Sequence, residues 1–239
     1  MQHPVDFMFL MDGTGSMQPC MDALKRNIDI FLEELMRPQS SMVKKQLDWR
    51  AKVVTYRDHP EDGDDWFDDN PFVHKDGAAL KEQLNKLEAW GGGDEPESLL
   101  DALHKVASIE QTNKSEEADP SKWRHRSDAS RVVIVFTDAT YHEPMTYPEG
   151  AGGTVEDVRN ICLSSNIMLL LYAPDDDAGQ YEQLASINKA QWNPIPGIGD
   201  DEEKFANGLK AYTGNQENFR KVIEALARTL SIAITPSVV

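Results

Sequence analysis

Mainly apolar runs alternate with helical periodicities along the first part of the chain. Residues 5–11 form one such run, which ends at Asp12 and is typical of a strand buried on both faces. From Cys20 to Leu35, apolar residues recur at three- and four-residue steps. That spacing predicts an amphipathic helix, which Pro38 stops. Residues 48–56 then predict a second strand.

The middle of the chain is richer in turns. An acidic segment, residues 61–71, predicts a loop, and Phe72 to His74 predicts a short edge strand. A helix with leucines at 80, 84 and 87 should end before Gly91, and another should run from about Pro96 to Val106. Residues 110–130 are polar and predict an exposed connection.

The clearest central strand is RVVIVFT, residues 131–137, which again ends at an aspartate, Asp138. Strands alternating with helices predict an α/β fold: a doubly wound, Rossmann-like, mostly parallel sheet with helices on both faces and one short antiparallel edge strand. Without an internal repeat or linker, residues 1–239 are expected to form a single domain. The remaining expected elements are a helix at 155–163, a strand at 167–172, a helix at 177–187, a strand at 190–195 and a closing helix through 219–230.

The charge balance changes the picture of what the chain binds. It has 24 Lys and Arg against 41 Asp and Glu, a net charge of −17. Such a chain repels phosphate backbones, which argues against nucleic-acid binding. The acidity suits cations or basic partners, or serves solubility alone.

The sequence also favours a cytoplasmic protein. No apolar stretch is long enough to cross a bilayer, so no membrane association is expected. Cys20 and Cys162 match no metal or redox spacing. We expect both to be buried thiols in a reducing compartment. The oligomeric state stays open.

Two predicted central strands end in aspartate, Asp12 and Asp138, and ligands of open α/β sheets gather at that edge. Asp12 is followed by hydroxyls at fixed spacing, Thr14 and Ser16, with glycines that let the loop fold tightly. These hard oxygen donors suit Mg²⁺, Mn²⁺ or Ca²⁺ better than zinc. Alternatively, the two hydroxyls only cap the helix that follows.

A third segment, GGGDEPES at residues 91–98, places Asp94 and Glu97 on a glycine-rich loop before the RVVIVFT strand. With the DGTGS and FTD motifs, it resembles the von Willebrand factor A (vWA) family, whose metal-ion-dependent adhesion site (MIDAS) uses an Asp-x-Ser/Thr-x-Ser loop. The middle loop is similar to the integrin beta subunit's Asp-x-Pro-Glu version. The resemblance spans nearly the whole chain and implies a metal site of Asp12, Thr14, Ser16, Glu97 and Asp138.

The resemblance implies a non-enzymatic protein-interaction module that holds a divalent cation, Mg²⁺ first, and recruits a partner protein through that partner's Asp or Glu. The chain departs from the integrin pattern at Gln18 and Pro19, so the adjacent regulatory site is expected to be absent. Gly92 stands where a neighbouring integrin site has an amide, which leaves Asp94 either as a ligand of a second cation or as a residue that orders the loop.

Two other functions compete with this interpretation. An aspartate followed by Gly-Thr is superficially similar to the haloacid-dehalogenase phosphotransferases, but their second aspartate is replaced here by Thr14, and no convincing phosphate-binding lysine follows. The other alternative is a vWA-fold scaffold without a functional metal.

Some further residues have two interpretations each. His59 and His142 are expected to be surface histidines near the same edge, with partner contact as the alternative. The acidic loop 61–69, with Trp66 and Phe67, either docks a basic partner or is solvated, with its aromatic rings folded back on the domain. Trp123 has the same two interpretations, a contact with a partner or a ring folded back on the domain.

Overall fold

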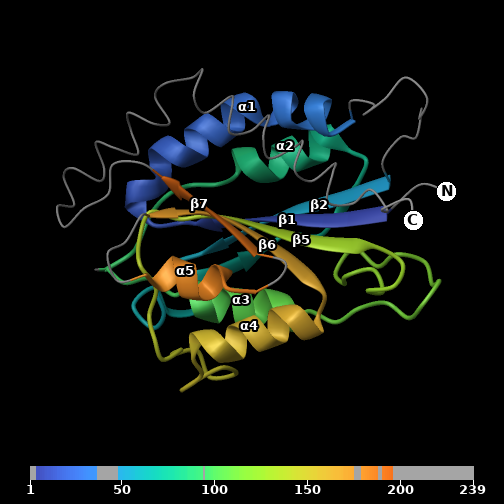
Figure 1. Ribbon diagram of the computed structural model, residues 1–239. Coiled ribbons are helices and arrows are strands. Elements are labelled where there is room, and N and C mark those ends of the chain that lie inside the picture. The colour runs from blue at the N-terminus through green and yellow to red at the C-terminus, as the bar shows by residue number, and fades with distance from the viewer. Residues whose placement is uncertain (1–3, 37–47, 94, 175–178, 188–189, 196–239) are drawn as a thin grey trace.

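The computed structural model describes residues 4–36, 48–93, 95–174, 179–187 and 190–195. Helices cover both faces of one central sheet (Figure 1). The expected closing helix at 219–230 and the expected helix stop at Pro38 lie outside the described residues, as does Asp94.

In the described part of the chain, a seven-stranded, mostly parallel sheet forms the middle layer, in the order β3-β2-β1-β5-β6-β7 with β4 also paired to β2. The parallel pairs join β1 with β2 and β5, and join β6 with β5 and β7. The short strands β3 and β4 both run antiparallel to β2. The strand bounds are Pro4–Asp12 (β1), Asp48–Tyr56 (β2), Phe67–Asp69 (β3), Val73–His74 (β4), Ser130–Phe136 (β5), Ile167–Pro174 (β6) and Ala190–Ile195 (β7).

The helices lie in two layers. α1 and α2 cover one face of the sheet, and α3, α4 and α5 cover the other (Figure 1). The crossovers between parallel strands require such helices, and they bury both faces of the sheet. The α-helices are Gln18–Met36 (α1), Gly77–Asn85 (α2), Leu99–Ser108 (α3), Val155–Ser164 (α4) and Gln180–Ala185 (α5), and the 3-10 turns are Gly15–Met17 (η1) and Gly63–Trp66 (η2).

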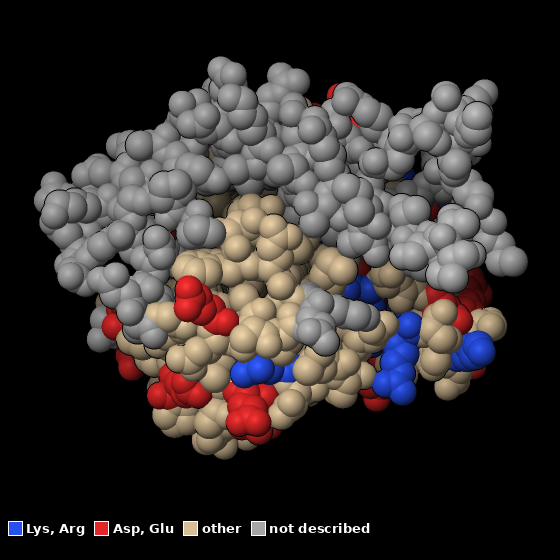
Figure 2. Space-filling model, viewed as in Figure 1, with Lys and Arg blue, Asp and Glu red and all other residues tan. Residues whose placement is uncertain are grey.

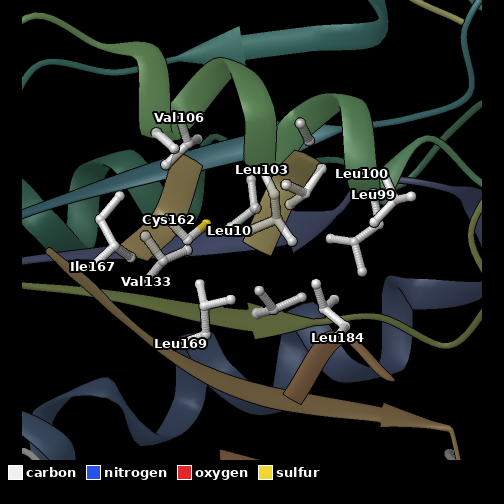
Figure 3. Close-up of a cluster of buried hydrophobic side chains, with 14 of the residues drawn as sticks. Leu10, Leu99, Leu100, Leu103, Val106, Val133, Cys162, Ile167, Leu169 and Leu184 are labelled. Carbon is white, nitrogen blue, oxygen red and sulfur yellow. The ribbon is translucent and has the colours of Figure 1, made fainter. Parts of the chain in front are cut away.

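Each face of the sheet has its own hydrophobic core, because successive side chains of a strand point to opposite faces. Phe7 and Phe9 of β1 pack against Phe31 of α1, at ring-centroid distances of 5.5 and 5.3 Å. On the other face, Leu10 packs with side chains of α3 and α4, among them Leu103 and Cys162 (Figure 3). The mainly apolar strands of the sequence are therefore buried on both sides.

The predicted fold class is confirmed, with two corrections at element ends. The acidic segment contains the edge strand β3, so two short antiparallel strands border β2 instead of one. The helix expected from Pro96 begins at Leu99, after Ser98 as its N-terminal cap residue. Backbone bonds explain that start, since Glu97 N–H donates to Thr140 O at 2.9 Å and is held outside the helix.

A buried ion network fixes the other end of the sheet. Asp6 is fully buried and accepts bonds from Arg50 Nη2 at 2.7 Å and from Arg124 Nε at 2.7 Å. Arg124 also reaches Asp48 at 2.9 Å, which ties the connection after α3 to the starts of β1 and β2. Trp123 is buried within this connection and donates to Val106 O at 3.1 Å, so it is a core residue.

Candidate metal centre

The predicted site lies where the strand order reverses. β2 pairs with one side of β1, and β5 pairs with the other side. Beyond β5, the sheet continues outward with β6 and then β7. Asp12 ends β1, and Asp138 follows β5 by two residues. Crevices at such a switch point are where open α/β sheets bind ligands. The topology therefore brings together two aspartates that are far apart in the sequence.

The first loop holds Asp12 rigidly. Asp12 is fully buried, and its Oδ1 accepts bonds from Thr14 N at 2.9 Å and from Thr14 Oγ1 at 2.7 Å. Its Oδ2 accepts a bond from Thr137 Oγ1 at 2.8 Å. Ser16 Oγ lies 3.4 Å from Thr14 Oγ1. Thr14 makes no side-chain cap bond to the turn that follows, so its hydroxyl serves the aspartate and not the helix end.

The glycine-rich second loop packs directly onto the first. Gly15 N donates to Gly91 O at 3.4 Å, and Trp90 N donates to Gly13 O at 2.9 Å. Gly92 has φ +77°, and a Cβ added there would lie 2.9 Å from Thr14 Cβ and 3.0 Å from Glu97 Oε1. Only glycine lets the backbone pass this close while adopting that φ. The approach of this loop to Thr14 and Glu97 thus explains the glycine at position 92.

The second and third loops are joined through Glu97. Its N–H donates to Thr140 O at 2.9 Å, and its carbonyl accepts from His142 N at 2.9 Å. Exposed Glu95 adds a bond from Thr140 N to its Oε1 at 2.8 Å. Together with the contacts of the first loop, these bonds bring Asp12, Glu97 and the segment that follows Asp138 to one edge of the sheet.

The electrostatics of the site are strongly unfavourable for bare carboxylates. Glu97 and Asp138 are each 5% exposed. Burial, followed by the charge of Asp12, raises the pKa of Glu97 to about 9 and that of Asp138 to about 8. Burial also raises the pKa of Asp12, against the hydrogen bonds from Thr14 and Thr137. Carboxyls that repel one another in a dry site need protons or a cation.

Two buried oxygens of this cluster lack protein partners. Among the described residues, Glu97 Oε2 and Asp138 Oδ2 are buried without a hydrogen bond. Unpaired buried oxygens are costly and call for an ion or a proton. No three or more His, Cys, Asp or Glu side chains of the described segments form a metal-holding group by themselves. A cation here would therefore need the hydroxyls of Thr14 and Ser16 as well.

A polar network that the sequence did not reveal supports Glu97. Asp58, which follows β2, is 2% exposed. Its Oδ1 accepts from Ser98 Oγ at 3.1 Å and lies 2.9 Å from His142 Nε2. Ser98 in turn accepts from His59 N at 2.9 Å. The two histidines thus lie at the edge where the sequence predicted them, as surface residues or as partner contacts, and each is bonded within this network.

Of the residues missed, Thr137 had a detectable signal. It directly precedes Asp138, and the parallel register of β1 and β5 pairs Met11 with Phe136, so Asp12 and Thr137 are the next positions along the two chains. The network around Asp58 had no comparable signal. Asp58 and Ser98 are 40 positions apart and belong to no common periodicity.

In the acidic loop 61–69, the ring of Trp66 is folded back on the domain, which was one of the two interpretations of this loop. That side chain is 2% exposed and packs 4.8 Å from the ring of Tyr147. Both cysteines are buried and free, as expected. Burial raises the pKa of each thiol, that of Cys162 to about 12. Within the segments that the structure describes, no helix combines the length and apolar character needed to cross a bilayer.

No protein-family model matches the chain, and no curated protein matches it. Among solved structures, the chain is similar to proximal thread matrix protein 1 from the mussel byssus. The two chains are 13% identical with a TM-score of 0.47, and the match covers 91% of this chain and 49% of that one. The chain thus spans about half the length of that structure. A likeness this distant assigns neither family nor function.

Proposed function

We propose that this chain is a vWA-type domain that binds a divalent cation, Mg²⁺ first, through Asp12, Thr14, Ser16, Glu97 and Asp138. The observation that carries the proposal is the pair of buried oxygens without partners, Glu97 Oε2 and Asp138 Oδ2, beside a third buried carboxylate and two hydroxyls. Oxygen donors of this kind are those that Mg²⁺, Mn²⁺ and Ca²⁺ prefer. The donor set therefore fits a hard cation.

Each residue has a distinct part in this site. Thr14 donates its hydroxyl proton to Asp12 and keeps acceptor lone pairs for a cation. Asp12, held by Thr14 and Thr137, supplies fixed negative charge. Glu97 and Asp138 supply the oxygens without protein partners. Ser16 is exposed and adds a hydroxyl at the open side of the site.

The activity we propose is the recruitment of a protein partner through one of its Asp or Glu side chains. A bound cation would supply positive charge for that carboxylate in a chain whose net charge is −17. Exposed Ser16 and the half-buried Gly92 border the site, so a side chain can approach it from solvent. We place the protein in the cytoplasm, where the free thiols Cys20 and Cys162 stay reduced.

We propose no catalytic step. Both oxygens of Asp12 already accept hydrogen bonds, which disfavours its use as a nucleophile. The position two residues later is a threonine that donates to Asp12, so it offers no acid/base carboxyl. Hydrolysis of a small chromogenic phosphate ester, dependent on Mg²⁺ and abolished in Asp12→Asn, would favour the phosphotransferase alternative.

Calorimetric titration with MgCl₂ and MnCl₂ tests the cation site. The wild type should bind with measurable heat, and Asp12→Ala and Ser16→Ala should lose that heat. Asp101→Asn is a matched control, because Asp101 is also buried and has an oxygen without a partner, but its other oxygen accepts bonds from Thr146 N and Tyr147 N, which are not predicted ligands. No heat from the wild type, or equal heat from all four proteins, would favour a scaffold without a metal.

A further inference from the structure

An open pocket of about 420 Å³ lies beside the metal centre, between the β2–β3 edge of the sheet and the segment that follows α2. Phe67, Leu87 and Trp90 give it an apolar lining. Trp90 is 44% exposed, and in the described part of the chain only Leu163 is a comparably exposed large hydrophobic side chain. Tryptophan is one of the residues enriched among the energetically dominant contacts of protein interfaces.

The mouth of the pocket is acidic. Asp65, Asp68 and Glu88 line it, and all three are exposed. Two cations also line it, and one of them, Lys86, forms an exposed ion pair in which its Nζ lies 3.1 Å from Glu82 Oε1. Patches of Asp and Glu (red) are visible elsewhere on the described surface too (Figure 2), so acidity alone does not mark the pocket. What distinguishes the pocket is that its carboxylates lie beside the exposed indole of Trp90.

The second cation, Arg57, builds the wall of the pocket. It is 6% exposed and donates to the carbonyl oxygens of Trp90, Asp65 and Glu88 at 3.1, 3.0 and 3.3 Å. Its guanidinium lies 4.0 Å from the centroid of the Trp90 ring. These bonds join Arg57 to the two segments that hold Asp65 and Trp90. The charges of Asp62, Asp68, Asp12 and Asp65 act on the guanidinium and offset its positive charge, while Asp68 and Glu88 stay exposed to solvent.

The pocket and the metal centre share a wall. Gly13, the residue after Asp12, accepts a bond from Trp90 N at 2.9 Å. A Cβ on Gly13 would lie 3.2 Å from Arg57 Cζ, so Arg57 packs directly against the first metal loop. A partner whose carboxylate reached the metal centre would therefore extend over the pocket with adjacent residues.

We propose that the pocket binds an arginine side chain of the same partner that supplies the carboxylate to the metal centre. A guanidinium matches both features of the pocket, because it stacks on aromatic rings and pairs with carboxylates through a planar fork of donors. This inference rests on the proposed function for the identity of the partner. The pocket itself does not depend on the cation.

Two peptide series test the proposal with the full chain in Mg²⁺. One series carries an aspartate and an arginine separated by Gly-Ser spacers of increasing length, and the other has glutamine in place of the arginine. By fluorescence anisotropy, the best arginine peptide should bind about tenfold more tightly than its glutamine twin. Trp90→Ala and Asp68→Asn should each remove most of this gain, and Leu163→Ala should keep it.

A metal-free measurement separates failure of the pocket from failure of the metal centre. N-acetyl-arginine amide is titrated in EDTA while NMR follows the Trp90 indole N–H, assigned by its loss in Trp90→Phe. A saturable shift of that signal supports the pocket even if no peptide binds. The proposal is overturned if arginine and glutamine peptides bind equally at every spacer length. It is also overturned if no peptide binds and the indole signal does not move with N-acetyl-arginine amide.

Discussion

Replacing Glu97 with glutamine separates the cost of a buried carboxylate from its use as a cation ligand. The pKa of Glu97 is raised from 4.5 to about 9, so the unfolded chain loses this proton at a lower pH than the folded protein. Without a cation, folded-state stability therefore falls as the pH rises from about 4.5 towards 9. At pH 7 the interval above 4.5, at about 1.4 kcal/mol per pH unit, gives roughly 3 kcal/mol.

Glu97→Gln has no such carboxyl and should be more stable than the wild type by up to roughly 3 kcal/mol at pH 7 in EDTA. At pH 4 the two proteins should differ little, because the carboxyl is protonated in the folded wild type and largely protonated in its unfolded chain. Mg²⁺ at a thousand times its Kd should reverse the order, since a ligand at that concentration stabilises the folded state by about 4.1 kcal/mol.

Urea denaturation at pH 4, 5.5, 7 and 8, in EDTA and in Mg²⁺, measures these differences. Asp101→Asn serves as the control for a buried carboxylate without a cation role, and it should leave the Mg²⁺ effect intact. The reasoning is refuted if Glu97→Gln lowers stability equally at pH 4 and pH 7, or if it keeps the full stabilisation by Mg²⁺.

Three further changes probe the surroundings of the site. Gly92→Ala should cost about 1–3 kcal/mol of stability and weaken Mg²⁺ binding, because its φ is +77° and its Cβ would press on Thr14 and Glu97; unchanged thermal denaturation and calorimetry would contradict this. Ser98→Ala should lower Mg²⁺ affinity about tenfold by releasing the second metal loop, with rescue by Ser98→Thr in the same titration. Asp6→Asn should cost about 3–5 kcal/mol in urea denaturation, because it leaves buried Arg50 without its carboxylate, yet Mg²⁺ affinity should not change.

The sequence predicted those parts of the site that local chemistry determines. β1 and β5 are mainly apolar because both faces of the sheet are buried, so their ends at Asp12 and before Asp138 are visible in the sequence. The positions of Thr14 and Ser16 follow from the loop after β1. Burial on both faces also predicted the layered fold without knowledge of the strand order.

The parts that depend on tertiary contacts were not predictable. Asp58 and His142 meet Ser98 only after β2, α3 and the segment after β5 have packed together. The edge strand β3 is short and acidic, and it is a strand through its antiparallel pairing with β2, in which Phe67 lies opposite Tyr56. Such pairings have no period along the chain, so sequence pattern alone placed these residues in loops.

The hydrogen bond from Thr137 to Asp12 joins residues 125 positions apart. A nascent chain carries the complete first loop long before β5 has been synthesised, yet it lacks the neighbouring strand that fixes Asp12. Chains grow at about 5–20 residues per second, so several seconds separate the two events. Cation binding should therefore begin only when the central strands have paired, which makes it a late marker of folding on the ribosome.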